Sequence, residues 1–102
     1  MKKRIYMLAT SEVQDDAAVT DAELVSDLST AEKMAREFMR DSVGAFLDIP
    51  AGETENAERA LQKRLSVETS VTGKLFTERY SYRCDGLCVT ATIQEDEVEE
   101  SI

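Results

Sequence analysis

The stretch "YSYRCDGLCVTATI" (residues 80–93) decides the fold, because it has the pattern of a β-hairpin. Asp85-Gly86 at its centre is a preferred pair for a two-residue type I′ turn, in which both central residues have positive φ. A turn at this pair aligns the flanking residues as follows: Cys84 with Leu87, Tyr82 with Val89, Tyr80 with Ala91 and Glu78 with Ile93.

This register separates apolar from polar side chains, because successive residues of a strand point to opposite faces. The apolar face collects Phe76, Tyr80, Tyr82, Cys84, Leu87, Val89, Ala91 and Ile93. The other face collects Thr77, Arg79, Ser81, Arg83, Cys88, Thr90, Thr92 and Gln94. A slip of one residue would exchange the two faces, so their segregation favours this register and places the first face on the core.

The two cysteines of the chain, Cys84 and Cys88, fall on opposite faces of this hairpin. Such side chains cannot meet the Cα and Cβ distances of a disulfide. Zinc needs about four nitrogen or sulfur ligands, and the chain has no histidine. The Cys-x-x-x-Cys spacing also differs from the Cys-x-x-Cys of redox proteins. We interpret the pair as unlinked structural thiols in a reducing compartment. An interchain disulfide, a metal shared between two chains and redox chemistry are the alternatives.

The N-terminal segment predicts two strands. "KRIYMLATS" (residues 3–11) is rich in β-forming residues and partly apolar on both faces, which is typical of a central strand. "EVQDDAAVTD" (residues 12–21) has the composition of a polar connection. "AELVSDL" (residues 22–28) predicts a short second strand, with a helical extension as the alternative.

Two helices are expected in the middle of the chain. Ser29 and Glu32 have the spacing of a capping box, and apolar residues then recur at helical spacing as far as Leu47. The "DIPAG" segment (residues 48–52) ends this helix, because proline and glycine break it. A second helix is expected to begin near Thr54, where glutamates gather at the positive end of its dipole.

These elements predict an α+β fold: a four-stranded antiparallel sheet in the order β-β-α-α-β-β, with two helices packed on one face. The first strand is expected centrally beside the last, and the other sheet face is expected to be exposed and polar. Residues 66–74 fit either a helix end or a β-rich connection. The length of 102 residues suits one domain, which we assign to residues 1–94, with an acidic C-terminal tail at residues 95–102.

The net charge of −9 is concentrated in two segments, residues 12–27 and 94–102, neither of which contains a basic residue. They define a candidate acidic interaction surface: Asp15, Asp16, Asp21, Glu95, Asp96, Glu97, Glu99 and Glu100. The two segments could form one negative surface if the first and last strands are neighbours. Solvated loops and a fraying tail are the simpler interpretation. Direct binding of nucleic acid is disfavoured, because it depends on a basic surface.

The composition argues against an enzyme, a bound metal or a cofactor. The chain has no histidine, no glycine-rich phosphate loop and no Gly-x-Ser-x-Gly motif. No run approaches about 20 apolar residues, so no membrane span is expected. The apolar run after Lys2, Lys3 and Arg4 is shorter than the apolar core of a signal peptide, so we expect a cytoplasmic protein.

Three segments carry a resemblance to other sequences: "MKKRIYMLATS", "SDLSTAEKMAREF" and "YSYRCDGLCVTATIQEDEVEE". In pattern the chain resembles short reading frames of bacterial genomes, plasmids and phages that have the β-β-α-α-β-β order. The resemblance implies a mobile-element or accessory origin and no assigned activity. No functional residue is carried over from it.

The sequence therefore predicts a non-enzymatic protein-interaction module, either monomer or homodimer, with a protein partner for which a basic surface is one option. One alternative is an acidic DNA mimic that inhibits a nucleic-acid-binding protein. The other is a small thiol-dependent enzyme or redox protein that uses Cys88.

Overall fold

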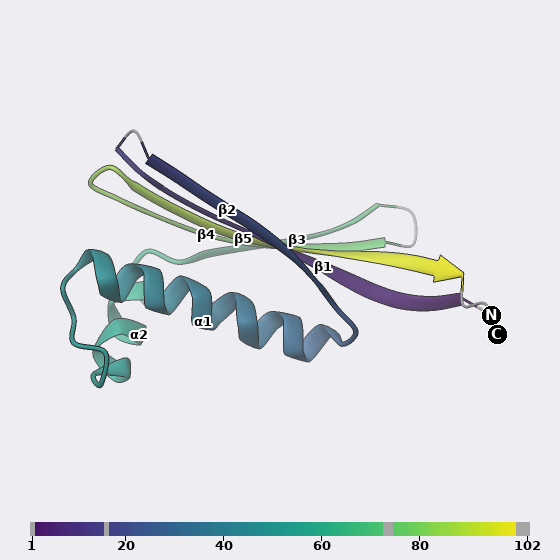
Figure 1. Ribbon diagram of the computed structural model, residues 1–102, viewed down its shortest axis with the longest axis horizontal. Coiled ribbons are helices and arrows are strands. Elements are labelled where there is room, and N and C mark those ends of the chain that lie inside the picture. The colour runs from purple at the N-terminus through teal and green to yellow at the C-terminus, as the bar shows by residue number, and fades with distance from the viewer. Residues whose placement is uncertain (1, 16, 73–74, 100–102) are drawn as a thin grey trace.

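The computed structural model describes residues 2–15, 17–72 and 75–99 (Figure 1). Its elements are β1 (Lys2–Gln14), β2 (Ala17–Val25), α1 (Leu28–Phe46), α2 (Thr54–Gln62), β3 (Ser66–Thr72), β4 (Leu75–Cys84) and β5 (Leu87–Glu99). The α+β class with two helices is confirmed. The predicted number of four strands is wrong, because residues 66–72 form a further strand and the order is β-β-α-α-β-β-β.

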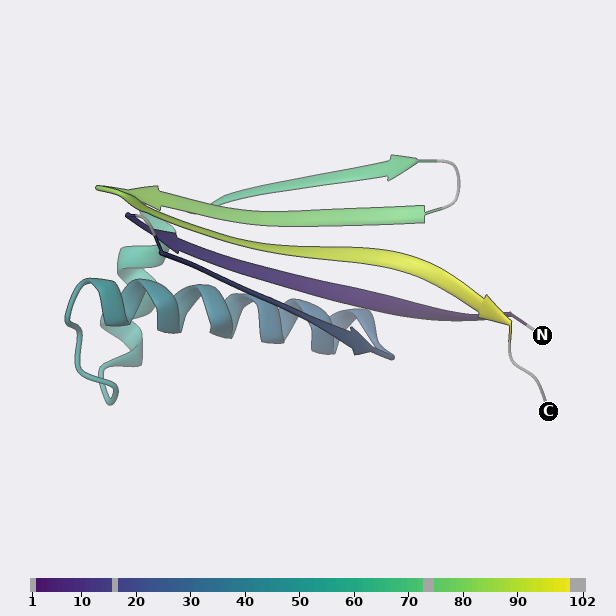
Figure 2. The ribbon, with the colours of Figure 1, turned by 45° about the horizontal axis from the view of Figure 1, so that its top comes forward.

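The five strands form one antiparallel sheet in the order β2-β1-β5-β4-β3. The first and last strands of the chain lie side by side at its centre, as predicted, with β1 paired to β5 from Lys2↔Glu99 to Gln14↔Leu87. β2 lies beside β1 at one edge of the sheet, and the β3–β4 hairpin extends the sheet on the side of β5 (Figure 2).

The β4–β5 hairpin has the predicted register, including Cys84↔Leu87 and Tyr80↔Ala91. Its two turn residues have the positive φ angles that a type I′ turn requires, 42° at Asp85 and 88° at Gly86. The turn chemistry and the alternating pattern thus specify the same pairing.

Both helices lie on one face of the sheet, and the opposite face carries no helix (Figures 1 and 2). The core lies between α1 and the central strands and consists of buried, mainly apolar side chains: Tyr6, Leu8, Val25, Ala31, Ala35, Met39, Val43, Leu61, Tyr80, Tyr82, Leu87, Val89, Ala91 and Ile93. The sheet extends past α1 at the end where β1 begins, which gives the molecule an elongated shape of 48 × 27 × 22 Å. Among the described residues, neither helix is both long and apolar enough to span a membrane.

Two predictions about the N-terminal half are wrong in detail. The second strand is Ala17–Val25 rather than residues 22–28, so most of the expected polar connection is paired strand. The helix cap is Asp27 rather than Ser29: the Asp27 carboxylate accepts from the Thr30 amide at 3.1 Å and from the Ser29 hydroxyl at 2.8 Å. An aspartate placed three residues before an amide caps a helix as well as a serine does.

The predicted boundary after Gln94 lies inside β5, which continues to Glu99. Residues 95–99 pair with the beginning of β1, and Glu95 is buried. These residues are therefore part of the sheet rather than a free tail. Residues 100–102 lie outside the described part of the chain.

Candidate functional site

The sheet face opposite the helices, here called the open face, carries little charge in this strongly acidic chain. Side chains alternate along each strand, so Met7 and every second residue of β1 on either side of it lie on this face. The residues of the neighbouring strands that pair with them lie on the same face. Its charged residues in the described strands are Lys3, Arg79, Arg83, Glu68 and Asp96. Three positive and two negative charges nearly cancel, so the excess acidity lies elsewhere.

An apolar strip runs along β1 and β2 on the open face. Met7 and Leu24 pair directly across the two strands, and 43% and 65% of their surfaces are exposed. The next pair on the same face is Ala9 and Ala22, and Val13 lies farther along β1. The polar pair Ser11 and Thr20 separates Val13 from the other residues on this face. Single exposed apolar residues are ordinary, whereas contiguous exposed apolar patches are a usual feature of contact surfaces. We call these residues the β1–β2 strip.

A cavity of about 390 Å³ lies on the other side of the sheet's centre, where β3 begins. Its lining consists of Arg64, Ser66, Arg79, Ser81, Tyr82, Arg83 and Cys88. Ser66 pairs with Ser81, so residues 82–84 have no strand partner on this side. Within the described part of the chain, none of the three arginines forms an ion pair. We call this feature the arginine cavity.

The two cysteines lie on opposite faces, as the register predicted. Cys88 lies on the open face opposite Arg83 and lines the arginine cavity. Cys84 lies on the helix-covered face, where its thiol donates to the Asp85 carboxylate at 3.7 Å. Both are free and half-buried.

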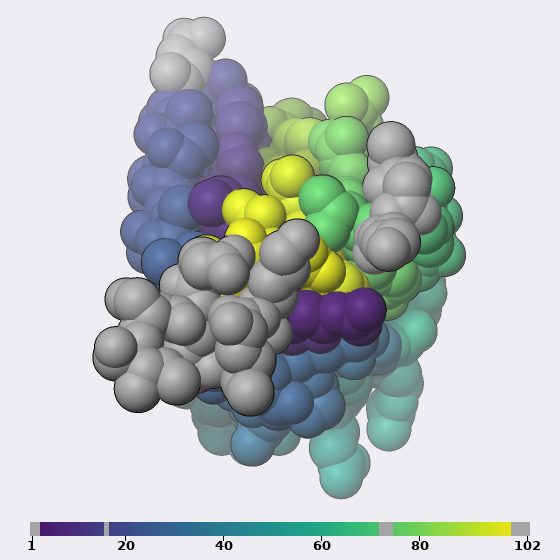
Figure 3. Space-filling view, turned by 90° about the vertical axis from the view of Figure 1, so that its right-hand side faces the viewer, coloured from purple at the N-terminus to yellow at the C-terminus, as the bar shows by residue number. Residues whose placement is uncertain are grey.

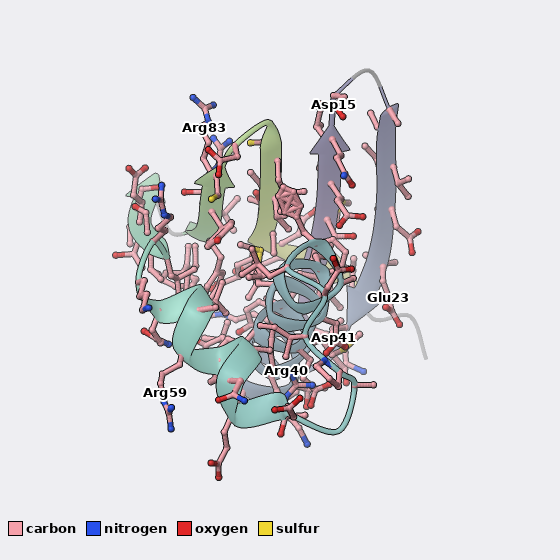
Figure 4. The ribbon with its side chains drawn as sticks, turned by 90° about the vertical axis from the view of Figure 1, so that its left-hand side faces the viewer. Asp15, Glu23, Arg40, Asp41, Arg59 and Arg83 are labelled. Carbon is pink, nitrogen blue, oxygen red and sulfur yellow. The ribbon has the colours of Figure 1, made fainter. Side chains whose placement is uncertain are left out.

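A smaller cavity of about 290 Å³ lies between α1, α2 and the segment that joins them. Arg40 and Asp41 at its edge form an ion pair at 3.2 Å, and Figure 4 shows them together on the helix side of the molecule. Gly44 permits the close contact of the two helices, because a Cβ there would lie 3.3 Å from the Cβ of Ala57. The residues that line this cavity therefore belong to the contact between the two helices and the segment that joins them.

The predicted acidic residues that the structure describes do not gather on one surface. Asp15 lies in the β1–β2 turn, where its amide donates to the carbonyl of Gly86 at 3.3 Å (Figure 4). Residues 95–97 lie at the other end of the sheet, beside the beginning of β1 (Figure 3). The first and last strands are neighbours, as expected, but they are antiparallel, so Asp15 and residues 95–97 lie at opposite ends of the β1–β5 ladder. β2 runs back from the turn, and its Val25 pairs with Tyr6, the β1 partner of Glu95.

The individual acidic side chains also differ in environment. Asp21, Asp96 and Glu97 are exposed, with Asp21 on the helix side of β2 and Asp96 on the open face. Glu95 is buried, with its Oε1 3.4 Å from the Nε of Arg4; among the described residues, that oxygen accepts no hydrogen bond. Asp16, Glu100 and the side chain of Glu99 lie outside the described part.

A buried polar group that the sequence reasoning missed lies on the helix-covered face. Glu78 is 7% exposed and accepts a hydrogen bond from the Tyr80 hydroxyl. Burial raises the pKa of Glu32 on α1, and a hydrogen bond to Glu78 and the charge of Glu78 raise it further. The predicted pairing of Glu78 with Ile93 was the signal that could have placed this carboxylate on the core face. Within the described residues, no three Cys, Asp or Glu side chains are arranged to hold a metal ion.

The comparisons with known proteins found no matching family model, no curated relative and no similar solved structure.

Proposed function

We propose that this protein is a non-enzymatic protein-interaction module that binds its partner through the β1–β2 strip. The exposed Met7–Leu24 pair carries the proposal. Burial of apolar surface stabilises a complex by roughly 25 cal/mol per Å², and a sheet face without a helix can pack flat against another surface. The low charge of the open face suits a partner whose contact surface is apolar, so binding should depend little on salt. A mobile-element accessory is the role that we propose from the sequence resemblance.

The acidic DNA-mimic function is the competing proposal. It rests on the net charge of −9 and on the acidic side chains outside the open face, such as Asp21 and Glu23 on β2. A basic partner held by these carboxylates would be released as salt screens the attraction. Salt dependence and the location of sensitive residues therefore separate the two proposals.

The experiment captures partners from source-cell extract with the intact chain and two matched variants. Leu24→Lys places a charge in the β1–β2 strip, and Val19→Lys places the same charge on the opposite face of the same strand. The two positions are equally exposed, 65% for Leu24 and 66% for Val19. Each protein is tested at low and at high salt, and captured proteins are identified by mass spectrometry.

We expect one partner that persists at high salt, is lost with Leu24→Lys and is kept with Val19→Lys. Light scattering of each purified variant checks whether Leu24→Lys changes the oligomeric state, which would make a second copy the partner. The proposal fails if the partner is lost at high salt and Leu24→Lys still binds it. Loss of such a partner in a double variant Asp21→Asn, Glu23→Gln would instead support the mimic.

A further inference from the structure

We infer that the arginine cavity binds a phosphoryl group. Three arginines, Arg64, Arg79 and Arg83, line this single cavity in a chain of net charge −9. Two serine hydroxyls, from Ser66 and Ser81, lie between them as further hydrogen-bond donors. The Met7–Leu24 pair of the β1–β2 strip lies away from this cavity, because β5 lies between β1 and β4, whereas Val13 pairs with Cys88 at the cavity edge.

The local structure brings the arginines together from two elements. Arg79 and Arg83 lie on the same face of β4 with Ser81 between them, about 13 Å apart along the strand by the rise per residue. Arginine side chains are long enough to converge over Ser81 from both directions. Arg64 enters from the connection between α2 and β3, where its amide donates to the Leu61 carbonyl at 3.2 Å.

The guanidinium groups are available for a ligand. Arg79 and Arg83 are exposed, and Figure 4 shows Arg83 extending from the sheet away from the helices. Three arginines outside the cavity form ion pairs: Arg4 with Glu95, Arg36 with Glu58 and Arg40 with Asp41. The remaining one, Arg59, forms none with the described residues. Within the described residues, those of the arginine cavity have no such partner.

The donor set suits a phosphoryl group better than a carboxylate. A carboxylate has one charge and two oxygens, which one arginine satisfies through two parallel hydrogen bonds. A phosphoryl group carries about −1.5 to −2 charges and three acceptor oxygens, which match several guanidiniums and hydroxyls. Glu68 opposes the ligand, because it pairs with Arg79 on the same face, although it does not line the cavity. Its charge provides a test of the electrostatics.

The probe is inorganic phosphate, titrated into the intact chain while backbone amide shifts are followed by NMR. We expect saturable shifts at residues 64–66, 79–83 and 88. Arg83→Gln should weaken binding about tenfold, because it removes a charge-assisted contact. Arg59→Gln on the exposed surface of α2 is the matched control and should have no effect (Figure 4). Glu68→Gln should tighten binding, which a merely structural role of the arginines would not produce.

Two further arms define the chemistry. The affinity for a phosphoserine peptide should fall between about pH 7.5 and pH 5.5, because the second pKa of a phosphoserine group is about 6. Sulfate keeps both charges over this range and should show no such fall. A phosphoserine peptide that binds more tightly than phosphate identifies a modified protein as the source, and equal affinity identifies a free phosphate compound. Shifts that do not saturate, or that survive Arg83→Gln unchanged in the folded variant, overturn the inference.

Discussion

The hydroxyl of Tyr80 donates a hydrogen bond to the carboxylate of Glu78, and both side chains are buried on the helix-covered face of the sheet. The two residues are two positions apart on β4, so they point to the same side. Burial of a carboxylate without a donor is costly, and Tyr80 supplies that donor from within the same strand. Burial raises the pKa of Tyr80, and the hydrogen bond to Glu78 raises it further, which keeps the hydroxyl protonated as a donor.

Removal of this donor should destabilise the protein. Tyr80→Phe removes the Tyr80 hydroxyl as a donor to the buried Glu78 carboxylate, and we expect a loss of about 1.5–3 kcal/mol in the free energy of unfolding. Urea denaturation measures it. Tyr6→Phe is the control, because Tyr6 is buried and its hydroxyl has no hydrogen-bond partner in the described part of the chain. Equal stability of the two variants would show that the Tyr80–Glu78 hydrogen bond contributes nothing.

The contact between Glu32 and Glu78 predicts a pH dependence. The pKa of Glu32 lies above its ordinary value of 4.5, chiefly through burial and then through Glu78, while Arg36 opposes the shift. At pH values between the unfolded and the folded pKa, the folded state therefore holds a proton on Glu32 that the unfolded state has released. Stability should then be fully present below pH 4.5 for this group and fall as pH rises through the folded pKa.

Glu32→Gln should remove this component, because the amide cannot ionise. We expect the variant to be more stable than the parent at neutral pH and to show a smaller loss of stability between acid and neutral pH. Urea unfolding at a series of pH values provides the comparison, with Glu55→Gln at an exposed position of α2 as control. Parallel pH profiles for the parent and Glu32→Gln would contradict the prediction.

The helix cap provides a direct comparison of sequence and structure. The sequence suggested Ser29, whereas Asp27 accepts hydrogen bonds from the Thr30 amide and from the hydroxyls of Thr30 and Ser29. Asp27→Ala should therefore lower the thermal midpoint more than Ser29→Ala, which only removes one donor to the cap. Circular dichroism melts of the two variants test the order. A larger effect at Ser29 would restore the capping box.

The β4–β5 hairpin was predictable because two independent local signals agree there. Asp85-Gly86 favours one turn type, and the alternating pattern favours one register. Because both local signals specify the same pairing, the prediction did not depend on tertiary contacts. The central position of β1 followed from the partly apolar character of both faces of "KRIYMLATS". Each of these signals lies within a short stretch of chain.

The remainder depends on contacts that a short stretch does not reveal. Val67 and Val71 on β3 are exposed, so this edge strand does not bury its apolar residues, and its pairing with β4 makes it a strand. β2 is exposed along all but its last residue, and its pairing with β1 rather than its composition makes it a strand. The burial of Glu95 depends on the pairing of β5 with β1, and the arginine cavity depends on where β3 begins beside β4.

The turn at Gly86 should tolerate no side chain. Its φ of 88° is strained for any L-residue, so Gly86→Ala should cost about 1–2 kcal/mol. A Cβ there would also lie 3.2 Å from the Oδ1 of Asp15, although that flexible side chain can move. Gly52→Ala is the control, because no atom lies within 4 Å of its added Cβ. Chemical denaturation measures the free energy of unfolding of both variants, and equal values would argue against the strained turn.

A chain that ends at Gln94 should be destabilised rather than merely less acidic. The truncation removes the β5 partners of residues 2–6, and residues 2–5 have no partner in β2 to replace them. Each lost backbone hydrogen bond should cost about 0.5–1.5 kcal/mol, and the amides of residues 2–5 should exchange faster with solvent. The double variant Asp21→Asn, Glu23→Gln lowers the charge while it leaves the ladder intact, so its amides should exchange as in the parent. Unchanged protection in the truncated chain would mean that residues 95–99 are dispensable to the sheet, as a tail would be.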